Sequence, residues 1–122
     1  MMKILGIDDN IDINRLLDTI MTEYGHQYSF VTDGREGVKL IQQNEYDLVL
    51  LDSGMPEFDS RDVLEALRQK DLLQKQRIAL FTASSISDDQ MNEFMKKGVR
   101  SLIRKPIDID LFLEKIEQIV AE

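Results

Sequence analysis

Short runs of aliphatic residues alternate along this chain with longer segments in which apolar residues recur every three or four positions. The short runs are typical of parallel strands, and the longer segments are typical of helices with one buried face. We therefore predict five strands, at residues 3–7, 27–31, 48–51, 78–81 and 102–104. The third run is apolar without alternation, as expected for a central strand that helices cover on both faces.

A helix is predicted after each strand. The first has the apolar stripe Ile13, Leu16, Leu17, Ile20, Met21 and Tyr24, and the last has the stripe Ile109, Phe112, Leu113, Ile116, Ile119 and Val120. Asp33, Ser87 and Asp108 can cap the second, fourth and fifth helices, and Gly25 and Gly98 end the first and fourth. The alternation predicts the α/β class, with a doubly wound five-stranded parallel sheet and five helices.

Four of the strand runs stop at a residue with reactive chemistry. The runs end at Asp8-Asp9, at Asp52, at Thr82 and at Lys105. In open parallel sheets, functional groups gather beyond the carboxyl ends of the strands. We therefore expect three carboxylates, a hydroxyl and an ammonium group to converge on one site.

The residue types at this predicted site indicate phosphate chemistry. Carboxylates that lie side by side repel one another unless a cation sits among them, and oxygen ligands alone are typical of Mg²⁺. Thr82 offers a hydrogen-bond donor and Lys105 a positive charge, which are the groups that hold phosphoryl oxygens. The sequence therefore predicts a Mg²⁺ cofactor, with phosphate chemistry on or near Asp52.

Four short motifs surround the predicted site: residues 7–10 (Ile-Asp-Asp-Asn), 47–56 (Asp-Leu-Val-Leu-Leu-Asp-Ser-Gly-Met-Pro), 81–84 (Phe-Thr-Ala-Ser) and 105–106 (Lys-Pro). With these motifs the chain resembles, over essentially its whole length, the receiver domain of two-component response regulators. The resemblance implies a flavodoxin-like three-layer sandwich with the strand order 2-1-3-4-5, a topology that is a known example of the doubly wound class. The length of the chain is that of a single domain, so we expect one receiver domain over residues 1–122.

The resemblance also implies a role for each residue of the predicted site. Asp52 is expected to be the phosphoacceptor and, with Asp8, Asp9 and the backbone carbonyl of Gly54, to hold Mg²⁺. Asp9 is expected to bind the ion directly and Asp8 largely through water.

Further roles concern the response to phosphorylation. Thr82 is expected to be the switch hydroxyl and Lys105 the phosphate partner, both drawn inward when Asp52 carries a phosphoryl group. The implied function is a phosphorylation-controlled signalling switch. The chain would catalyse only its own phosphoryl transfer and a slow autodephosphorylation.

Two kinds of protein partner follow from the resemblance. The phosphoryl donor would be a sensor histidine kinase or a phosphotransfer protein, and the downstream target would bind at the fourth helix, fifth strand and fifth helix. The basic residues Lys96, Lys97, Arg100 and Arg104 lie in this region. They are either a solvated surface or a docking site for an acidic partner.

Composition narrows the function classes further. The formal net charge of −8 argues against a nucleic-acid surface, because such surfaces use Lys and Arg to neutralise phosphates. The absence of cysteine excludes disulfides and thiolate metal sites. No apolar stretch reaches membrane length, so we expect a soluble, cytoplasmic protein. An effector module would need sequence beyond Glu122, and the chain does not distinguish a lone receiver from an excised one.

Two other function classes compete with a receiver domain. A haloacid-dehalogenase-type phosphohydrolase also uses aspartate and Mg²⁺, but it requires Asp-x-Asp after the first strand, whereas Asp8 and Asp9 are adjacent. A flavodoxin-like cofactor carrier would need a phosphate-binding loop there, and these carboxylates would repel a flavin phosphate.

The sequence departs from the receiver pattern at two positions. Leu102 stands where many receivers carry an aromatic gate coupled to the switch hydroxyl, and Ser60 follows Asp59 where glycine is more usual. The first departure predicts a different route for the signal, and the second questions the local turn. The single histidine, His26, is expected to lie at the surface without a catalytic role.

Overall fold

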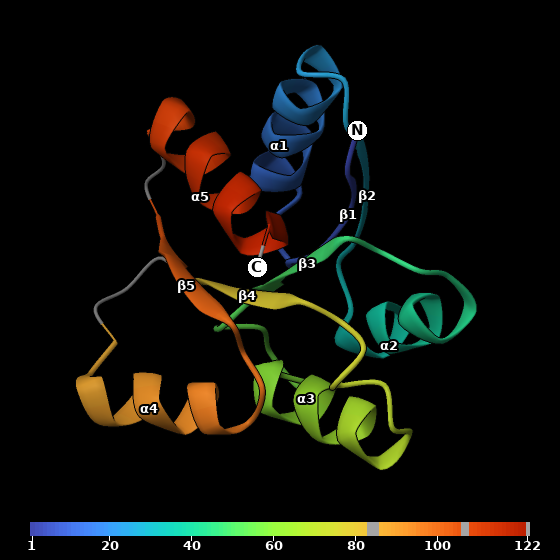
Figure 1. Cartoon of the computed structure of the whole chain (residues 1–122). Helices are drawn as coiled ribbons and strands as arrows, with labels where there is room; N and C mark the ends of the chain where they lie inside the picture. The colour runs from blue at the N-terminus through green and yellow to red at the C-terminus, as the bar shows by residue number, and fades with distance from the viewer. Residues whose placement is uncertain (83–85, 106–107, 122) are drawn as a thin grey trace.

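Five parallel strands form one sheet in the order β2-β1-β3-β4-β5 (Figure 1). The strands are β1 (Lys3–Ile7), β2 (Gln27–Val31), β3 (Leu48–Asp52), β4 (Ile78–Thr82) and β5 (Ser101–Arg104). The predicted strand positions and their order are confirmed. The computed structural model describes residues 1–82, 86–105 and 108–121, so Ala83, Ser84 and Pro106 of the quoted motifs lie outside the described residues.

Helices cover both faces of the sheet, which gives the predicted three layers. They are α1 (Ile11–Glu23), α2 (Gly34–Gln43), α3 (Ser60–Gln69), α4 (Asp88–Lys96) and α5 (Ile109–Ala121). Figure 1 shows α1 and α5 on one face and α2, α3 and α4 on the other. Among the described residues, no helix is long and apolar enough to span a bilayer.

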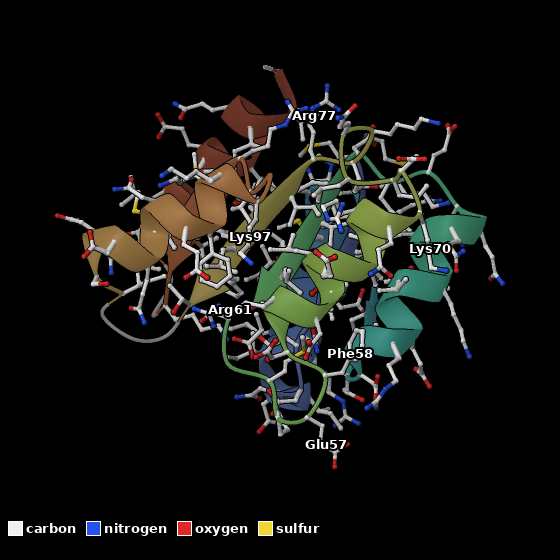
Figure 2. All side chains as sticks on the ribbon, turned by 90° about the horizontal axis from the view of Figure 1, so that it is seen from below. Glu57, Phe58, Arg61, Lys70, Arg77 and Lys97 are labelled. Atoms are coloured by element: carbon white, nitrogen blue, oxygen red, sulfur yellow. The ribbon has the colours of Figure 1, made fainter. Side chains whose placement is uncertain are left out.

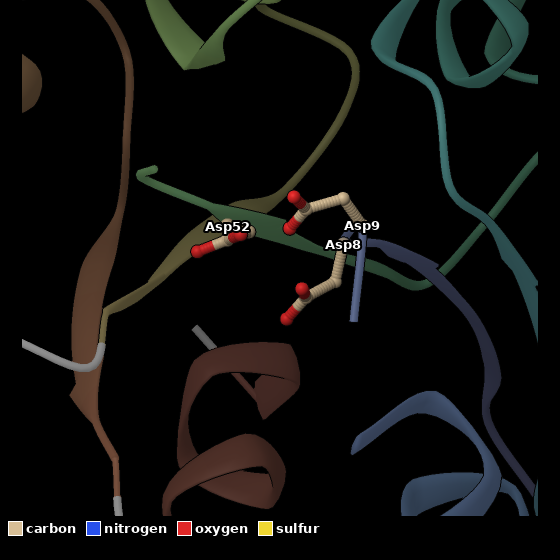
Figure 3. Close-up of side chains that lie close together, drawn as sticks. All are labelled: Asp8, Asp9 and Asp52. Atoms are coloured by element: carbon tan, nitrogen blue, oxygen red, sulfur yellow. The ribbon is translucent and has the colours of Figure 1, made fainter. Parts of the chain in front are cut away.

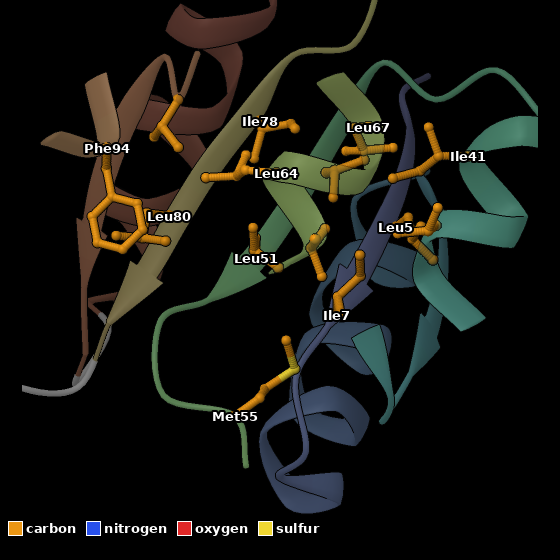
Figure 4. Packing of buried hydrophobic residues seen from close by; sticks show 14 of the residues in the cluster. Leu5, Ile7, Ile41, Leu51, Met55, Leu64, Leu67, Ile78, Leu80 and Phe94 are labelled. Atoms are coloured by element: carbon orange, nitrogen blue, oxygen red, sulfur yellow. The ribbon is translucent and has the colours of Figure 1, made fainter. Parts of the chain in front are cut away.

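Side-chain alternation divides the strands between two cores. On β3, Val49 and Leu51 pack with α2, α3 and α4 (Figure 4), whereas Leu48 and Leu50 pack with α1 and α5. Every residue of β3 and β4 is buried. This two-sided burial is the reason that these strands have no polar residues before their last position.

The sheet register brings the predicted site residues to one edge. Ile7 of β1 lies beside Leu51 of β3, so that Asp8 and Asp52 both follow directly from a paired position. On the other side Asp52 pairs with Phe81, and Thr82 pairs with Arg104. The carboxyl ends of these strands are therefore level with one another.

The predicted stripe of α1 is wrong at two positions. Leu16 and Tyr24 are 51% and 55% exposed, and the polar Asn14 is fully buried in their place. Successive helical residues turn by about 100°, so Leu16 points well away from the buried Leu17. Tyr24 follows the last residue of the helix, at the C-cap. Ile109 is 43% exposed because it too lies at a helix end, as the first residue of α5.

Local capping explains where the loops near the site turn into helices. Asn10 caps α1 by accepting the N–H of Ile13, and Ser87 with Gln90 forms the predicted capping box of α4. Before α3, Asp59 forms a capping box with Asp62, and the buried Ser60 begins the helix. The turn that Ser60 called into question therefore forms.

Candidate functional site

Three carboxylates from two strand ends meet in the predicted place (Figure 3). One oxygen each of Asp8, Asp9 and Asp52 can be chosen so that all three lie within 4.8 Å of one another. They border a hollow of about 240 Å³. The hollow is lined by Asp8, Asp9, Asn10, Ile13, Asp52, Ser53, Gly54 and Lys105.

Asp8 is held on three sides. Its Oδ1 accepts the backbone N–H of Asn10 at 2.9 Å, and its Oδ2 accepts a hydrogen bond from Lys105 Nζ at 2.8 Å. Its backbone N–H donates to the carbonyl of Val31 on β2. The residue is only 3% exposed, so the carboxylate has little freedom to reorient. Asp9, by contrast, is exposed.

Asp52 ends β3 and is 7% exposed. Its Oδ1 accepts the N–H of Gly54 at 3.3 Å and lies 3.6 Å from Lys105 Nζ. Burial, reinforced by the charge of Asp8, raises the pKa of Asp52 from 3.8 to about 6, although Lys105 and the Gly54 N–H act in the opposite direction. The raised pKa therefore reflects mainly the burial of this carboxylate, which disfavours its charged form.

The loop after Asp52 is anchored in the core. Met55 is 6% exposed and packs with the α2–α3–α4 core (Figure 4), while Ser53 donates its N–H to the carbonyl of Phe81. Ser60 Oγ donates to the carbonyl of Ser53 at 3.4 Å. These contacts hold Gly54 at the rim of the hollow. A side chain at position 54 would meet no neighbouring atoms, so its backbone carbonyl does not depend on glycine.

Lys105 and Thr82 are coupled through the backbone. The N–H of Lys105 donates to the carbonyl of Thr82 at 2.7 Å, and Lys105 Nζ lies 4.8 Å from the ring centre of Phe81. Thr82 itself is 1% exposed at the end of β4. Among the described residues, Thr82 is not part of the lining of the hollow. The structure thus brings Lys105 to the carboxylates and leaves Thr82 buried at the end of β4.

Two polar residues near the site were missed by sequence reasoning. Tyr28 of β2 donates its hydroxyl to Asn14 Oδ1, and Asn14 Nδ2 donates to the backbone carbonyl of Asp8. Burial, and then the charges of Asp8 and Asp18, raise the pKa of Tyr28 above its usual value. The sequence did contain a signal for Asn14: it lies three residues before Leu17, and this helical spacing places it on the buried face of α1.

Other residues singled out by sequence lie away from the chemistry. His26 is half-buried, and its Nδ1 accepts the N–H of Met2, which is a structural role. Leu102 is 9% exposed and packs in the core that contains Phe94. It also lines a second hollow of about 430 Å³. The lining of that hollow is Met91, Met95, Arg100, Ser101, Leu102, Arg104 and Lys115.

The donor set of the site fits a hard divalent cation. Asp8, Asp9 and Asp52 could hold a metal ion, and all three supply carboxylate oxygens. Mg²⁺ favours such ligands and keeps several waters, for which the neighbouring hollow leaves room.

The comparison with protein families gives one match over most of the chain. The model of the response regulator receiver domain matches residues 4–117. Sporulation initiation phosphotransferase F of Bacillus subtilis is 28% identical, with 95% of this chain and 91% of that protein covered. The transcriptional regulatory protein YclJ of the same organism is 26% identical over 98% of this chain and 51% of that protein. The chain spans about half the length, or less, of the first curated relatives.

Solved structures agree with the family match. The receiver domain of the Francisella response regulator 1452 is 26% identical and superposes with a TM-score of 0.87, with 99% of this chain and 98% of that chain covered. The receiver domain of the Pseudomonas aeruginosa sensor histidine kinase PA1611 has the same fold at 20% identity, with a TM-score of 0.86 and coverage of 99% and 98%. That structure is described with a magnesium ion in its active site cleft.

These findings decide between the function classes weighed from the sequence. They support a signalling domain and give no support to a haloacid-dehalogenase-type phosphohydrolase. Receiver domains act with histidine kinases or phosphotransfer proteins. The chain belongs to the response regulator receiver domain family, whose members act in two-component signalling.

Proposed function

We propose that Asp52 is the phosphoacceptor of this receiver domain. The supporting observation is the placement of its carboxylate at the end of the central strand, beside an open hollow and 3.6 Å from Lys105 Nζ. In the proposed step, an Asp52 carboxylate oxygen forms a bond to the phosphorus of a partner's phosphohistidine. The phosphorus–nitrogen bond breaks, and the imidazole leaves with the electron pair and takes up a proton.

Asp8, Asp9, Asp52 and the backbone carbonyl of Gly54 are proposed to hold Mg²⁺. The bound ion would neutralise charge on the phosphoryl oxygens and relieve the repulsion between donor and acceptor. The chain's own contribution is to fix the acceptor: the N–H of Gly54 and the charge of Lys105 both face Asp52 Oδ1. Lys105 is proposed to move from Asp8 toward the new phosphoryl group.

Thr82 is proposed to carry the signal from the site. Its buried position at the end of β4 and the hydrogen bond between its backbone carbonyl and the Lys105 N–H support this role, because they link the backbones of the two residues. The output would be altered binding of a protein target at α4, β5 and α5. Two features support this face as the binding site. One is the second hollow, and the other is a set of exposed basic residues that would attract an acidic partner: Lys96, Lys97, Arg100 and Arg104.

Residues 1–122 would act as one receiver domain in the cytoplasm, with phosphoryl groups supplied by a sensor histidine kinase or phosphotransfer protein. Its only catalysis would be its own phosphoryl transfer and a slow autodephosphorylation.

The test is mass spectrometry of the protein after incubation with acetyl phosphate and Mg²⁺. One added phosphoryl group is expected on the parent and on Asp71→Asn, a control at an exposed position with φ 58° that asparagine tolerates. Asp52→Asn and the parent in EDTA should remain unlabelled. Equal labelling of Asp52→Asn would show that Asp52 is not the acceptor.

A further inference from the structure

A chain of two hydrogen bonds, one partly and one fully buried, leads from β2 to the pocket of carboxylates. The hydroxyl of Tyr28 donates to Asn14 Oδ1 at 2.9 Å, and Asn14 Nδ2 donates to the carbonyl oxygen of Asp8 at 2.8 Å. Asn14 is 0% exposed. The three residues come from β2, α1 and the end of β1, so this chain fixes the relative positions of the three elements behind the pocket.

The direction of these bonds is determined by chemistry. A carbonyl oxygen only accepts, so the Asn14 amide must present its NH₂ group to Asp8. Its oxygen then faces Tyr28, which donates its hydroxyl hydrogen. The reversed amide would place two oxygens against each other in a buried site. Each group has one compatible orientation, and the Asp8 carbonyl is held accordingly.

The strand β1 makes room for this arrangement at Gly6. A Cβ atom at position 6 would collide with the Tyr28 hydroxyl, lie 2.7 Å from Tyr28 Cζ and 3.0 Å from Asn14 Oδ1. Gly6 is paired with Phe30, two residues beyond Tyr28 on the neighbouring strand. The close approach of the tyrosine to the backbone of β1 therefore depends on the absence of a side chain there.

Fixing the Asp8 carbonyl also fixes Asp9. The carbonyl of Asp8 and the N–H of Asp9 belong to one planar peptide group, so the orientation of one determines that of the other. The carboxylate of Asp9 is exposed, and this peptide group positions the Cα atom that carries it. We propose that Asn14 and Tyr28 are positioning residues that orient the Asp8–Asp9 peptide and thereby set the affinity of the pocket for a divalent cation. The inference rests on the proposed Mg²⁺ site.

The experiment measures Mg²⁺ binding to the full chain by NMR, with the Asp9 amide as the local probe. Tyr28→Phe keeps the ring and removes only the hydroxyl, and Tyr24→Phe removes the hydroxyl of an exposed tyrosine as the matched control. Substitutions behind a metal ligand typically weaken binding by about tenfold or more. We expect about tenfold weaker binding in Asn14→Ala and about threefold in Tyr28→Phe, which acts one bond further away.

Three further results separate positioning from general destabilisation. The double variant should bind Mg²⁺ no more weakly than Asn14→Ala alone, because Tyr28 acts only through Asn14. In phosphorylation by acetyl phosphate, the half-saturating Mg²⁺ concentration should rise while the rate at saturating Mg²⁺ is kept. The Asp9 amide signal of the metal-free protein should shift in Tyr28→Phe and stay in place in Tyr24→Phe.

The possible results discriminate between the inference and the proposed function. If the parent binds Mg²⁺ and Tyr28→Phe binds it equally well with an unshifted Asp9 amide, the positioning role is refuted while the metal site stands. If the parent itself does not bind Mg²⁺, the proposed function fails and the inference fails with it. Tyr28→Phe decides the matter even if Asn14→Ala does not fold.

Discussion

The ammonium group of Lys105 lies closer to Asp8 than to Asp52. Lys105 Nζ is 2.8 Å from Asp8 Oδ2 and 3.6 Å from Asp52 Oδ1, and the side chains of Lys105 and Asp8 are 10% and 5% exposed. The lysine therefore supplies positive charge to two of the carboxylates that are proposed to hold Mg²⁺. A cation bound there would compete with the lysine for the charge of these carboxylates.

Replacing Lys105 with methionine should strengthen Mg²⁺ binding by about three- to tenfold, because a positive charge close to the ligands is removed. Phosphorylation should nevertheless slow, since the proposed phosphate partner is lost. Isothermal titration with Mg²⁺ measures the first effect. Lys115→Met, on the exposed surface of α5, is the control and should bind Mg²⁺ like the parent. Weaker binding by Lys105→Met would contradict the competition.

The raised pKa of Asp52 predicts a pH-dependent gain in stability for Asp52→Asn without metal. The native protein holds the Asp52 proton up to about pH 6, whereas the unfolded chain releases it near pH 3.8. Between these values the folded state binds more protons, so the parent loses stability as pH rises. Asparagine does not titrate, and the variant avoids this loss.

The gain should reach about 1–2 kcal/mol above pH 6, a value reduced from the full shift because the pocket is open on one side. Urea unfolding in EDTA, from pH 3.5 to 8, measures it. Above about pH 7 the difference between the two proteins should no longer change with pH, because Asp52 is ionised in both the folded and the unfolded state, which provides an internal control. A difference that stays constant over the whole range would show that Asp52 has no raised pKa.

The strand ends were predictable because burial leaves few choices. β3 and β4 are covered on both faces, so their first polar residues, Asp52 and Thr82, mark the edge of the sheet. The exposed faces of helices were less predictable. Leu16 is apolar yet half exposed, and Asn14 is polar yet buried, because its two hydrogen-bond partners are distant in sequence or backbone atoms. Polarity alone does not reveal such partners.

The helices α3 and α4 are joined by a paired contact on the surface shown in Figure 2. Arg61 Nε and Nη2 each donate to Glu93 at 3.2 Å, and the Arg61 guanidinium lies 5.0 Å from the ring centre of Phe94. Glu93→Gln should therefore increase amide exchange along α4. Glu65→Gln, which breaks a similar pair with Arg68 inside α3, is the control and should leave α4 unchanged. Unaltered exchange in both variants would show that the contact does not restrain α4.

Leu102 predicts how the chain responds to beryllofluoride, a mimic of the aspartyl phosphate. The side chain is buried beside Phe94 and has no hydroxyl to exchange between buried and exposed positions. NMR changes on activation should concentrate at Thr82 and in residues 86–96, while the Leu102 methyl groups keep their buried contacts. A large reorientation of Leu102 would contradict this prediction.

The sequence predicted which carboxylates and which lysine meet at the site, but it did not predict the contacts between their side chains. Asp8, Asp9, Asp52 and Lys105 follow from the ends of strands in a parallel sheet. The closer contact of Lys105 with Asp8 depends on side-chain distances that strand positions do not determine. The place of Asn14 behind the pocket depends likewise on the packing of α1 against β2.

The close packing at Gly6 links the residues that are tolerated at positions 6 and 28. Alanine at position 6 would collide with the ring end of Tyr28, and phenylalanine at position 28 would still leave the Cζ atom in the way. A side chain at position 6 therefore requires either that the end of the Tyr28 side chain moves away or that a shorter residue replaces it. Either change alters the donor to Asn14, so a side chain at position 6 and the present hydrogen bond from Tyr28 to Asn14 exclude each other.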